Sequence, residues 1–295
     1  EVWGAQWVSS LPVPPHNGPE WWVQTTGSDV EGNGSIELPF RNIQTALDAV
    51  NENDVIYVGA GSFIENLVWP ETDGINLIGG TEGTTVIDGS SNATTVVFID
   101  GADVASRLSG FTIKNGSGFY IDGDDNPTDH IWENDFLAGG GIFCNFAGNG
   151  MNGMQIDNLI IKDNTADSGG GIYLYKSNIN FEDIVIQNNV ADGSGGGFYI
   201  FTSNPRFTNV VVDWNVALGS GGGWLTSQSH PLFKNVTIAH NEALLYNSGG
   251  LYLHHYSSPT LINCTIIDNH GEYRGGGLYL TNESEVVVTN SILYD

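Results

Sequence analysis

Short segments in which apolar and polar residues alternate recur along the chain from residue 139 onward. Each follows a run of glycines, as in DSGGGIYLY at 167–175, and each copy starts 26 to 30 residues after the previous one. An alternation of period 2 favours β-strands over helices, and a repeat of this length predicts a solenoid. The residues that directly follow the glycines are all apolar: Ile142, Ile172, Phe198, Trp224, Leu251 and Leu278.

A second motif keeps the same period: an Asn or Asp is followed six residues later by Asn, with a run rich in β-branched residues between them. The pairs are Asn158/Asn164, Asp183/Asn189, Asn209/Asn215, Asn235/Asn241 and Asn263/Asn269. Together the motifs predict about three short strands per repeat, which is one coil of a parallel β-helix with strands stacked ~4.8 Å apart. We expect the Asn residues to turn the corners, because Asn tolerates a left-handed φ. Phe181, Phe207 and Phe233 share one position of the repeat and predict an internal aromatic stack.

In each glycine-led strand, the first and third positions are apolar, apart from Thr226, and are predicted to face the core, so the second position faces outward. Aromatic residues dominate that outward column. Exposed rings in line could stack on sugar rings or contact a protein partner. The alternative is that they stack on one another beneath the preceding loops. The candidate ligand-binding residues are Phe143, Tyr173, Tyr175, Tyr199, Phe201, Tyr252 and Tyr279.

The N-terminal part is less regular. Residues 40–50 place four apolar side chains on one helical face, and we predict a helix there that caps the open end of the coils. The predicted organisation is an arm or linker at 1–22 and a single β-helix domain at 23–295. That domain consists of a cap at 23–54 and coils at 55–295. NSILYD at 290–295 begins a further copy of the polar motif, so we expect more coils or domains to follow in the intact protein.

The strongly acidic composition changes which partners are expected. The formal net charge is −26, from 34 acidic against 8 basic residues, and such a surface repels nucleic acids and anionic membranes. No run of 18 apolar residues exists, so no membrane-inserted segment is predicted. The two cysteines, Cys144 and Cys264, lie on core positions about four coils apart, or ~19 Å, which predicts two buried free thiols.

Two stretches carry a resemblance to known proteins. WWVQTTGSDVEGNGSIELPFRNIQTALDAVNENDVIYVGAGSFIEN at 21–66, with LSGFTIKNG at 108–116, resembles secreted bacterial right-handed β-helix proteins of the pectate-lyase-like superfamily. The GGG(I/L)Y repeats with paired Asn are similar to those of polymorphic outer-membrane proteins and surface adhesins. The resemblance covers about residues 21–295. It implies an all-β, right-handed parallel β-helix solenoid with an N-terminal capping α-helix, and secretion to a bacterial surface. The superfamily contains enzymes and non-catalytic adhesins, so its function stays open.

Polysaccharide lyases of this superfamily use an Arg or Lys base beside calcium-binding carboxylates. Here Arg206 and Lys234, with Glu182 and Asp157, share one predicted strand face on neighbouring coils. That cluster is the candidate catalytic site for a lyase, and the alternative is a set of solvated or paired surface charges. Outward positions offer no converging set of aspartates for a hydrolase, and no HExxH or HxH pattern indicates zinc.

An acidic insertion, DGDDNPTD at 122–129, offers the hard oxygen ligands that calcium prefers. Its alternative is a solvated acidic loop. The candidate metal ligands are Asp122, Asp124, Asp125 and Asp129, with calcium as the expected cofactor. The leading functional hypothesis is a non-catalytic secreted or cell-surface module that binds a polysaccharide or a cell-surface partner, and a calcium-dependent polysaccharide lyase is the alternative.

Overall fold

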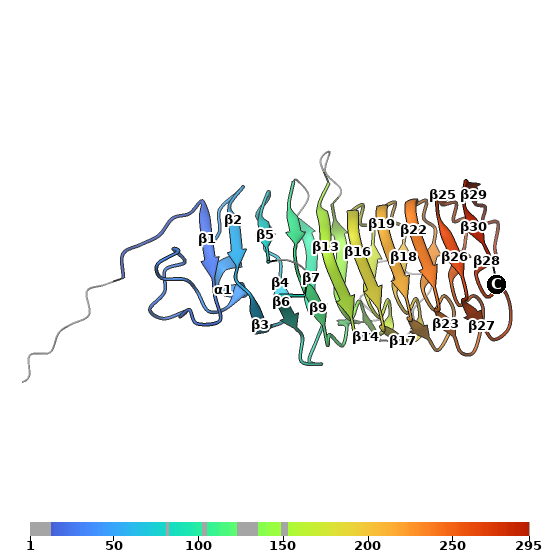
Figure 1. The fold of residues 1–295 in the computed structure, drawn as a ribbon, viewed down its shortest axis with the longest axis horizontal. Helices are drawn as coiled ribbons and strands as arrows, with labels where there is room; N and C mark the ends of the chain where they lie inside the picture. The colour runs from blue at the N-terminus through green and yellow to red at the C-terminus, as the bar shows by residue number, and fades with distance from the viewer. Residues whose placement is uncertain (1–12, 81–82, 102–104, 123–134, 149–152, 295) are drawn as a thin grey trace, which may run out of the picture.

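The strands of this chain stack side by side along one axis, from β1 at the N-terminal end to β29 and β30 at the C-terminal end (Figure 1). The computed structural model describes residues 13–80, 83–101, 105–122, 135–148 and 153–294. Strands from successive repeats pair in parallel, and the eight-stranded sheet gives about eight turns. The predicted parallel β-solenoid is therefore confirmed.

Three sheets form the walls of the solenoid. The 15-stranded sheet contains β1 (Glu20–Val23), β2 (Val55–Val58), β3 (Gly61–Ile64), β5 (Asn76–Ile78), β6 (Thr85–Asp88), β8 (Arg107–Ser109), β9 (Thr112–Lys114), β13 (Gln155–Lys162), β16 (Asn180–Gln187), β19 (Arg206–Asp213), β22 (Leu232–Ala239), β25 (Thr260–Ile262), β26 (Thr265–Ile267), β29 (Val287–Thr289) and β30 (Ile292–Leu293). The eight-stranded sheet contains β4 (Leu67–Val68), β7 (Val96–Gly101), β12 (Ile142–Ala147), β15 (Ile172–Tyr175), β18 (Phe198–Phe201), β21 (Trp224–Ser227), β24 (Leu251–His254) and β28 (Leu278–Leu280).

The seven-stranded sheet contains β10 (Phe119–Ile121), β11 (Phe136–Ala138), β14 (Thr165–Ser168), β17 (Val190–Ser194), β20 (Val216–Ala217), β23 (Glu242–Ala243) and β27 (His270–Gly271). Its first pair, β10 and β11, is antiparallel. About three short strands were predicted per repeat, but in β13, β16, β19 and β22 the segments before and after the first polar residue form one bent strand. The third wall comes instead from the short strands after the second Asn, which the sequence analysis did not predict.

The core follows the predicted columns. Side chains at the first and third positions after the glycines are fully buried in the middle coils, for example Ile172 and Leu174. Phe181, Phe207 and Phe233 stack face to face inside the solenoid, with ring centroids 5.0 and 5.3 Å apart. Because every coil adds the same apolar positions at the same register, the core is continuous along the whole axis.

The two Asn positions of each repeat form two different ladders. The first members, including Asn209 and Asn235, are mostly exposed, and all have φ between 50° and 56°, as expected for a corner. The second members are buried: from Asn189 to Asn269, each Oδ1 atom accepts hydrogen bonds from the backbone N–H and the Nδ2 of the Asn one coil earlier. A ladder of serines that the sequence analysis missed does the same at another corner, where the Ser177 and Ser203 backbone amides donate to the next hydroxyl.

The repeated glycines are explained by backbone crowding between coils. Gly195 adopts φ +73°, and a Cβ added to Gly196 would collide with the carbonyl oxygen of Gly222 in the next coil. A side chain at this corner would therefore push neighbouring coils apart. The glycines precede each strand because only glycine allows adjacent backbones to approach so closely.

Helix is almost absent. The only helix of the described residues is α1 (Ile43–Leu47), which lies within the predicted helix 40–50 and buries Ile43, Ala46 and Leu47. At the N-terminus of α1, the backbone amides of Ile43 and Gln44 donate hydrogen bonds to the Glu65 carboxylate. With only five residues, α1 is much shorter than the expected capping helix, and a capping role stays a prediction. No helix in the described parts of the chain has the length and apolarity to cross a membrane.

Both cysteines are buried and unpaired, as predicted. Burial raises the pKa of the Cys144 thiol, which lies in a dry core position. Each thiol therefore serves as a small apolar side chain.

Candidate functional site

The outward aromatic column exists in the predicted register. Phe143, Tyr173, Tyr199, Tyr252 and Tyr279 pair through β12, β15, β18, β24 and β28, and Leu225 in β21 interrupts them. Their rings stack nearly parallel, with centroids 5.7, 5.2 and 5.6 Å apart for the three adjacent aromatic pairs. A solenoid places equivalent side chains one above another, so this stacking follows directly from the repeat.

The prediction that these rings are exposed is wrong for the middle coils. Phe143 and Tyr173 are each 3% exposed, Tyr199 is 6% exposed, and the flanking Tyr175 and Phe201 are also buried. Burial raises the pKa of the Tyr173 and Tyr199 hydroxyls.

The antiparallel pair β10 and β11 accounts for part of this burial. Phe119 of β10 stacks on Phe143 with ring centroids 4.6 Å apart, and Phe136 of β11 contacts Tyr173 at 6.2 Å. These residues form a second apolar cluster outside the main core. In the middle coils the rings therefore stack on one another beneath other segments, which is the alternative given in the sequence analysis. A glycan cannot stack on rings that are already covered, although no observation tests binding itself.

Within the described residues, the aromatic column is accessible in β24 and β28. Tyr252 and Tyr279 are partly exposed and stack on each other. Their hydroxyls have polar neighbours: Tyr252 lies 3.2 Å from the Thr281 hydroxyl, and Arg274 donates to the Tyr279 hydroxyl at 3.2 Å. The two rings thus present an apolar face beside hydrogen-bonding groups.

Two histidines border this surface. Burial, with a smaller contribution from His255, lowers the pKa of His254 to about 4. His254 is therefore neutral at physiological pH, and its Nε2 lies 3.2 Å from the Asn282 side-chain amide. The only cationic side chain known to contact the two tyrosines in the described part of the chain is Arg274.

The candidate lyase residues lie on one sheet face but do not converge. Lys234 and Glu182 share a register column two coils apart, about 10 Å at the strand spacing, and Arg206 lies in the neighbouring outward column. Arg206 and Lys234 form no ion pair among the described residues. The two cations are therefore free on adjacent coils, whereas Glu182 lies beyond direct contact with Lys234.

Asp157, the fourth residue of that face, belongs to a different cluster. Arg107 donates to both of its carboxylate oxygens at 2.6 and 2.7 Å, and Ser109 donates at 2.6 Å. Burial alone would raise the pKa of Asp157, but the hydrogen bonds from Arg107, Ser109 and Asn158 together hold it below the usual value. The sequence analysis did not pair Arg107 with Asp157. The sequence nevertheless contained a signal for this pair. Lys114 and Lys162 share a column, and counting back five residues from each aligns Ser109 with Asp157, two residues from Arg107.

Of the four predicted calcium ligands, the structure describes only Asp122. Asp124, Asp125 and Asp129 lie outside the described residues, and Asp122 follows β10. Within the described ranges no group of three or more His, Cys, Asp or Glu side chains is arranged to hold a metal ion. The calcium site stays a prediction.

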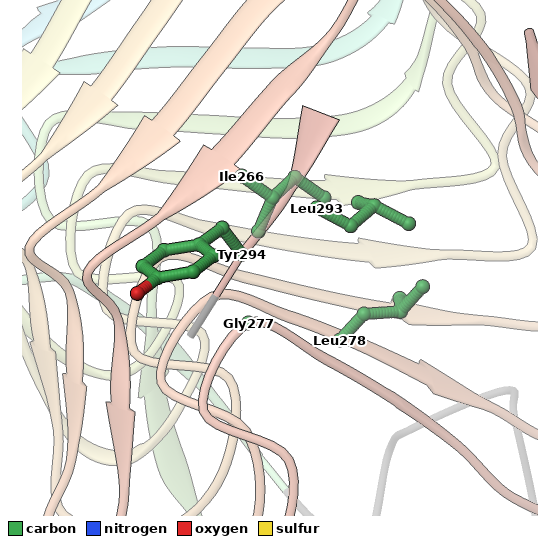
Figure 2. Close-up of a pocket in the computed structure, with 5 residues that line it drawn as sticks. All are labelled: Ile266, Gly277, Leu278, Leu293 and Tyr294. Atoms are coloured by element: carbon green, nitrogen blue, oxygen red, sulfur yellow. The ribbon is translucent and has the colours of Figure 1, made fainter. Parts of the chain in front are cut away.

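A hollow lies at the C-terminal end, where Figure 2 shows Ile266, Leu278, Leu293 and Tyr294 around it. Its volume is about 210 Å³, which is below the ~300–1,000 Å³ of typical ligand pockets. Ile266, Leu278 and Leu293 occupy core columns of the repeat, so the hollow is continuous with the core, and the Tyr294 side chain is the polar group that lines it.

Comparison with known proteins supports the fold. Residues 184–295 match a family described as a right handed beta helix region. The chain is thus a right-handed parallel β-helix, as the resemblance implied. A search of curated proteins found no match.

Solved structures with the same fold include several pectin methylesterases. The Erwinia chrysanthemi enzyme has a TM-score of 0.52 at 12% identity, covering 92% of this chain and 88% of its own. The enzyme from carrot has a TM-score of 0.52 at 12% identity over 96% and 84%. The Yersinia enterocolitica enzyme has a TM-score of 0.51 at 15% identity over 86% and 90%. At such identities the similarity establishes the fold and leaves the function open.

Proposed function

We propose that this chain is a non-catalytic, secreted or cell-surface β-helix module that binds a glycan at β24 and β28. The observation that carries this proposal is the partly exposed, stacked pair Tyr252 and Tyr279, with Arg274 hydrogen-bonded to one hydroxyl. Tyrosine rings offer an apolar face to the C–H groups of a sugar, while the hydroxyls and the guanidinium offer hydrogen bonds to its oxygens. The protein's charge of −26 disfavours a polyanionic glycan, so we infer an uncharged one.

The fold is compatible with such a partner. β-Helices of the same architecture include pectin methylesterases, enzymes named for a polysaccharide. A solenoid surface presents equivalent side chains at the spacing of the strands, so a linear polymer lying along the axis can contact several coils in succession. This supports a polysaccharide over a small isolated ligand.

The test uses substitutions that the fold already accepts. Leu225 occupies the same column between Tyr199 and Tyr252, so Tyr252→Leu with Tyr279→Leu should preserve packing while removing the rings and hydroxyls. On an array of uncharged glycans, we expect the wild type to bind and the double variant to lose at least about tenfold in affinity, or about 1.4 kcal/mol.

The matched control is Tyr246→Leu, which alters a tyrosine that is 57% exposed in the loop after β23 and is not part of the eight-stranded sheet. It should bind like the wild type. Equal binding by the double variant and the wild type would falsify the proposal, as would a loss of binding in Tyr246→Leu of the same size.

A second candidate function, a polysaccharide lyase, is favoured by one observation. Arg206 and Lys234 are free cations on adjacent coils of a strongly acidic protein, and a local positive patch of that kind attracts an anionic substrate. The assay is depolymerisation of uronate glycans with calcium present, followed by ultraviolet absorbance. Activity that disappears in Arg206→Ala or Lys234→Ala would place the lyase ahead of the binding module.

A further inference from the structure

A pocket of about 360 Å³ borders β1, at the N-terminal end of the stack of strands (Figure 1). Its volume lies within the ~300–1,000 Å³ that is typical of ligand pockets. Two segments that do not belong to the repeat form most of its walls: residues 16–20, which lead into β1, and residues 35–37. The side chain of Trp22 in β1 completes the lining.

The Trp22 ring has one covered face and one face toward the pocket. Tyr57 of β2 packs on the ring with centroids 4.9 Å apart and the ring planes inclined by 33°. β1 is the first strand of its sheet in the described part of the chain, and a loop borders its other edge. There the Trp22 N–H donates to the Gly34 carbonyl oxygen, and the Trp22 carbonyl oxygen accepts from the Phe40 N–H. Residues 35–37 belong to this loop, so they line the pocket on the side of Trp22 away from Tyr57.

Carboxylates line the same pocket as the open face of the ring. Glu20 and Trp22 lie two residues apart in β1, so both project from its outward face, whereas Trp21 and Val23 are buried on the other face. Glu37 belongs to the loop on the open side of the ring. Both glutamates are exposed, and neither forms an ion pair among the described residues. The pocket therefore combines an accessible indole with two carboxylates that have no countercharge.

The surrounding chain supplies no Lys or Arg to balance this charge. Residues 1–40 contain neither residue type. Arg41, the next cation along the sequence, lines a different pocket together with Glu65. An aromatic pocket with uncompensated carboxylates attracts a cationic ligand.

The walls are held in place by hydrogen bonds within the chain. The Asn33 side-chain amide donates to the Pro14 carbonyl oxygen at 2.8 Å. His16 Nε2 donates to the Glu20 carbonyl oxygen at 2.7 Å, and the imidazole packs edge-on against Trp21 with centroids 4.9 Å apart. A pocket whose walls are already ordered loses less conformational entropy when a ligand binds.

We propose that this pocket binds the side chain of an arginine residue carried by a partner polypeptide. The planar guanidinium would stack on the open face of Trp22 and donate hydrogen bonds to Glu20 and Glu37. Its aliphatic stem would pack against Pro19 and Ile36, which also line the pocket. A compact, strongly hydrated ammonium group cannot stack in this way, so arginine is favoured over lysine.

This pocket is separate from the glycan site proposed above. It borders β1 in the 15-stranded sheet, whereas Tyr252 and Tyr279 lie in the eight-stranded sheet near the opposite end of the stack (Figure 1). The net charge of −26 favours a basic polypeptide as the partner here. The two proposals therefore stand or fall independently.

Titration followed by nuclear magnetic resonance tests the ligand class, because the Trp22 indole N–H and the backbone amides of residues 35–37 report on the pocket directly. Nα-acetyl-arginine N-methylamide should shift these signals until they saturate. The citrulline analogue, which has nearly the same shape without the charge, should bind at least about tenfold more weakly. Methylguanidinium, which lacks the stem, should bind several-fold more weakly, and added salt should weaken all binding. Equal affinity for the citrulline analogue would overturn the need for a cation, and equal affinity for methylguanidinium would overturn the assignment to an arginine side chain.

Substitutions in the lining test the residues. Glu20→Gln and Glu37→Gln keep the size of each side chain and remove its charge, so each should weaken binding of the capped arginine several-fold and the double variant at least about tenfold. Trp22→Ile copies Ile78, which occupies the same column in β5, and should abolish the shifts of residues 35–37. Trp22→Tyr, which copies Tyr57 and retains a ring, serves as the second variant if the first does not fold, and it should bind more weakly than the wild type.

Glu31→Gln is the matched control. Glu31 is exposed in the same N-terminal region but is not one of the residues that line the pocket, so this variant changes the net charge by the same amount. It should bind the capped arginine as well as the wild type does. An equal loss in Glu31→Gln, or unchanged affinity in the Glu20/Glu37 double variant, would refute the assignment. The Tyr252→Leu/Tyr279→Leu variant should retain arginine binding, which separates failure of this pocket from failure of the glycan site.

Discussion

Replacing Asn215 by Ala should destabilise the protein far more than the loss of one surface polar group would. Asn215 is fully buried, and its Nδ2 donates to the Asn241 Oδ1 and to the carbonyl oxygens of Ile186 and Asp213. Its Oδ1 accepts from the backbone N–H and the Nδ2 of Asn189. Ala can make none of these bonds, and the site lies inside the solenoid, so water cannot easily replace them.

The magnitude follows from the groups left without partners. The Asn189 backbone N–H loses its acceptor, at a cost of about 1–3 kcal/mol for a buried unsatisfied donor. The Asn189 Nδ2 loses its hydrogen bond to the Asn215 Oδ1 but keeps the one to the Ile161 carbonyl oxygen. Each of the remaining lost bonds contributes about 0.5–1.5 kcal/mol. Because such terms are not fully additive, we take the lower end of their sum and expect the free energy of unfolding to fall by at least about 3 kcal/mol, a large fraction of a typical total of about 5–15 kcal/mol.

Equilibrium urea unfolding, followed by far-ultraviolet circular dichroism, measures this change. The control is Asn209→Gly, because Asn209 belongs to the exposed ladder and Gly keeps its left-handed φ of 55°. The control should lose less than about 1 kcal/mol. Hydrogen exchange should also show the Asn189 amide unprotected in Asn215→Ala. If Asn215→Ala costs no more than Asn209→Gly, the buried ladder does not stabilise the coils in the way described.

Two further predictions concern acid and metal. The lowered pKa of Asp157 means that its ion pair with Arg107 stabilises the fold above the unfolded-state pKa of about 3.9 and is lost as the pH falls through the folded-state value, so Asp157→Asn should flatten the acid limb of a plot of stability against pH. An unchanged acid limb in that variant would mean that other carboxylates control acid unfolding. If calcium binds at the acidic insertion around Asp122, millimolar calcium should raise the Tm and EDTA should lower it, and identical melting curves would remove calcium as a cofactor.

The fold could be predicted from the sequence because every coil of a solenoid repeats the same pattern of core, corner and glycine positions. Once the glycine-led strands and the paired Asn residues are aligned, all coils must place the same positions inward. The agreement between coils therefore identifies the inward-facing columns. The buried cysteines and the Phe181 stack were predictable for the same reason. The serine ladder was equally readable, since Ser177, Ser203, Ser229 and Ser257 recur at the repeat spacing, but short hydroxyl side chains give a weaker pattern than glycine runs.

The candidate site was harder to predict, because exposure depends on segments that do not repeat. The outward phase of Tyr173 was right, yet the sequence of one coil cannot show that β10 and β11 add a second apolar layer outside it. The Arg107–Asp157 pair was harder to recognise, because the insertion between β9 and β13 interrupts the repeat and only the shared column of Lys114 and Lys162 carries the register across it.

Departures from the repeat are therefore the best guide to function in a chain of this kind. A residue that matches its column is explained by stacking, backbone crowding or corner geometry, because all coils share those demands. A residue that differs from the others in its column is not explained by these shared structural requirements. Any backbone strain at such a residue therefore points to a role beyond the fold. Tyr173 matches its column and is buried. Trp22 stands where the repeat begins, so one face of its ring meets Tyr57 of the next coil and the other borders the non-repeating segments that form the N-terminal pocket. By this criterion Trp22, which the alternation pattern did not single out, is a stronger site candidate than the aromatic residues that the pattern selected.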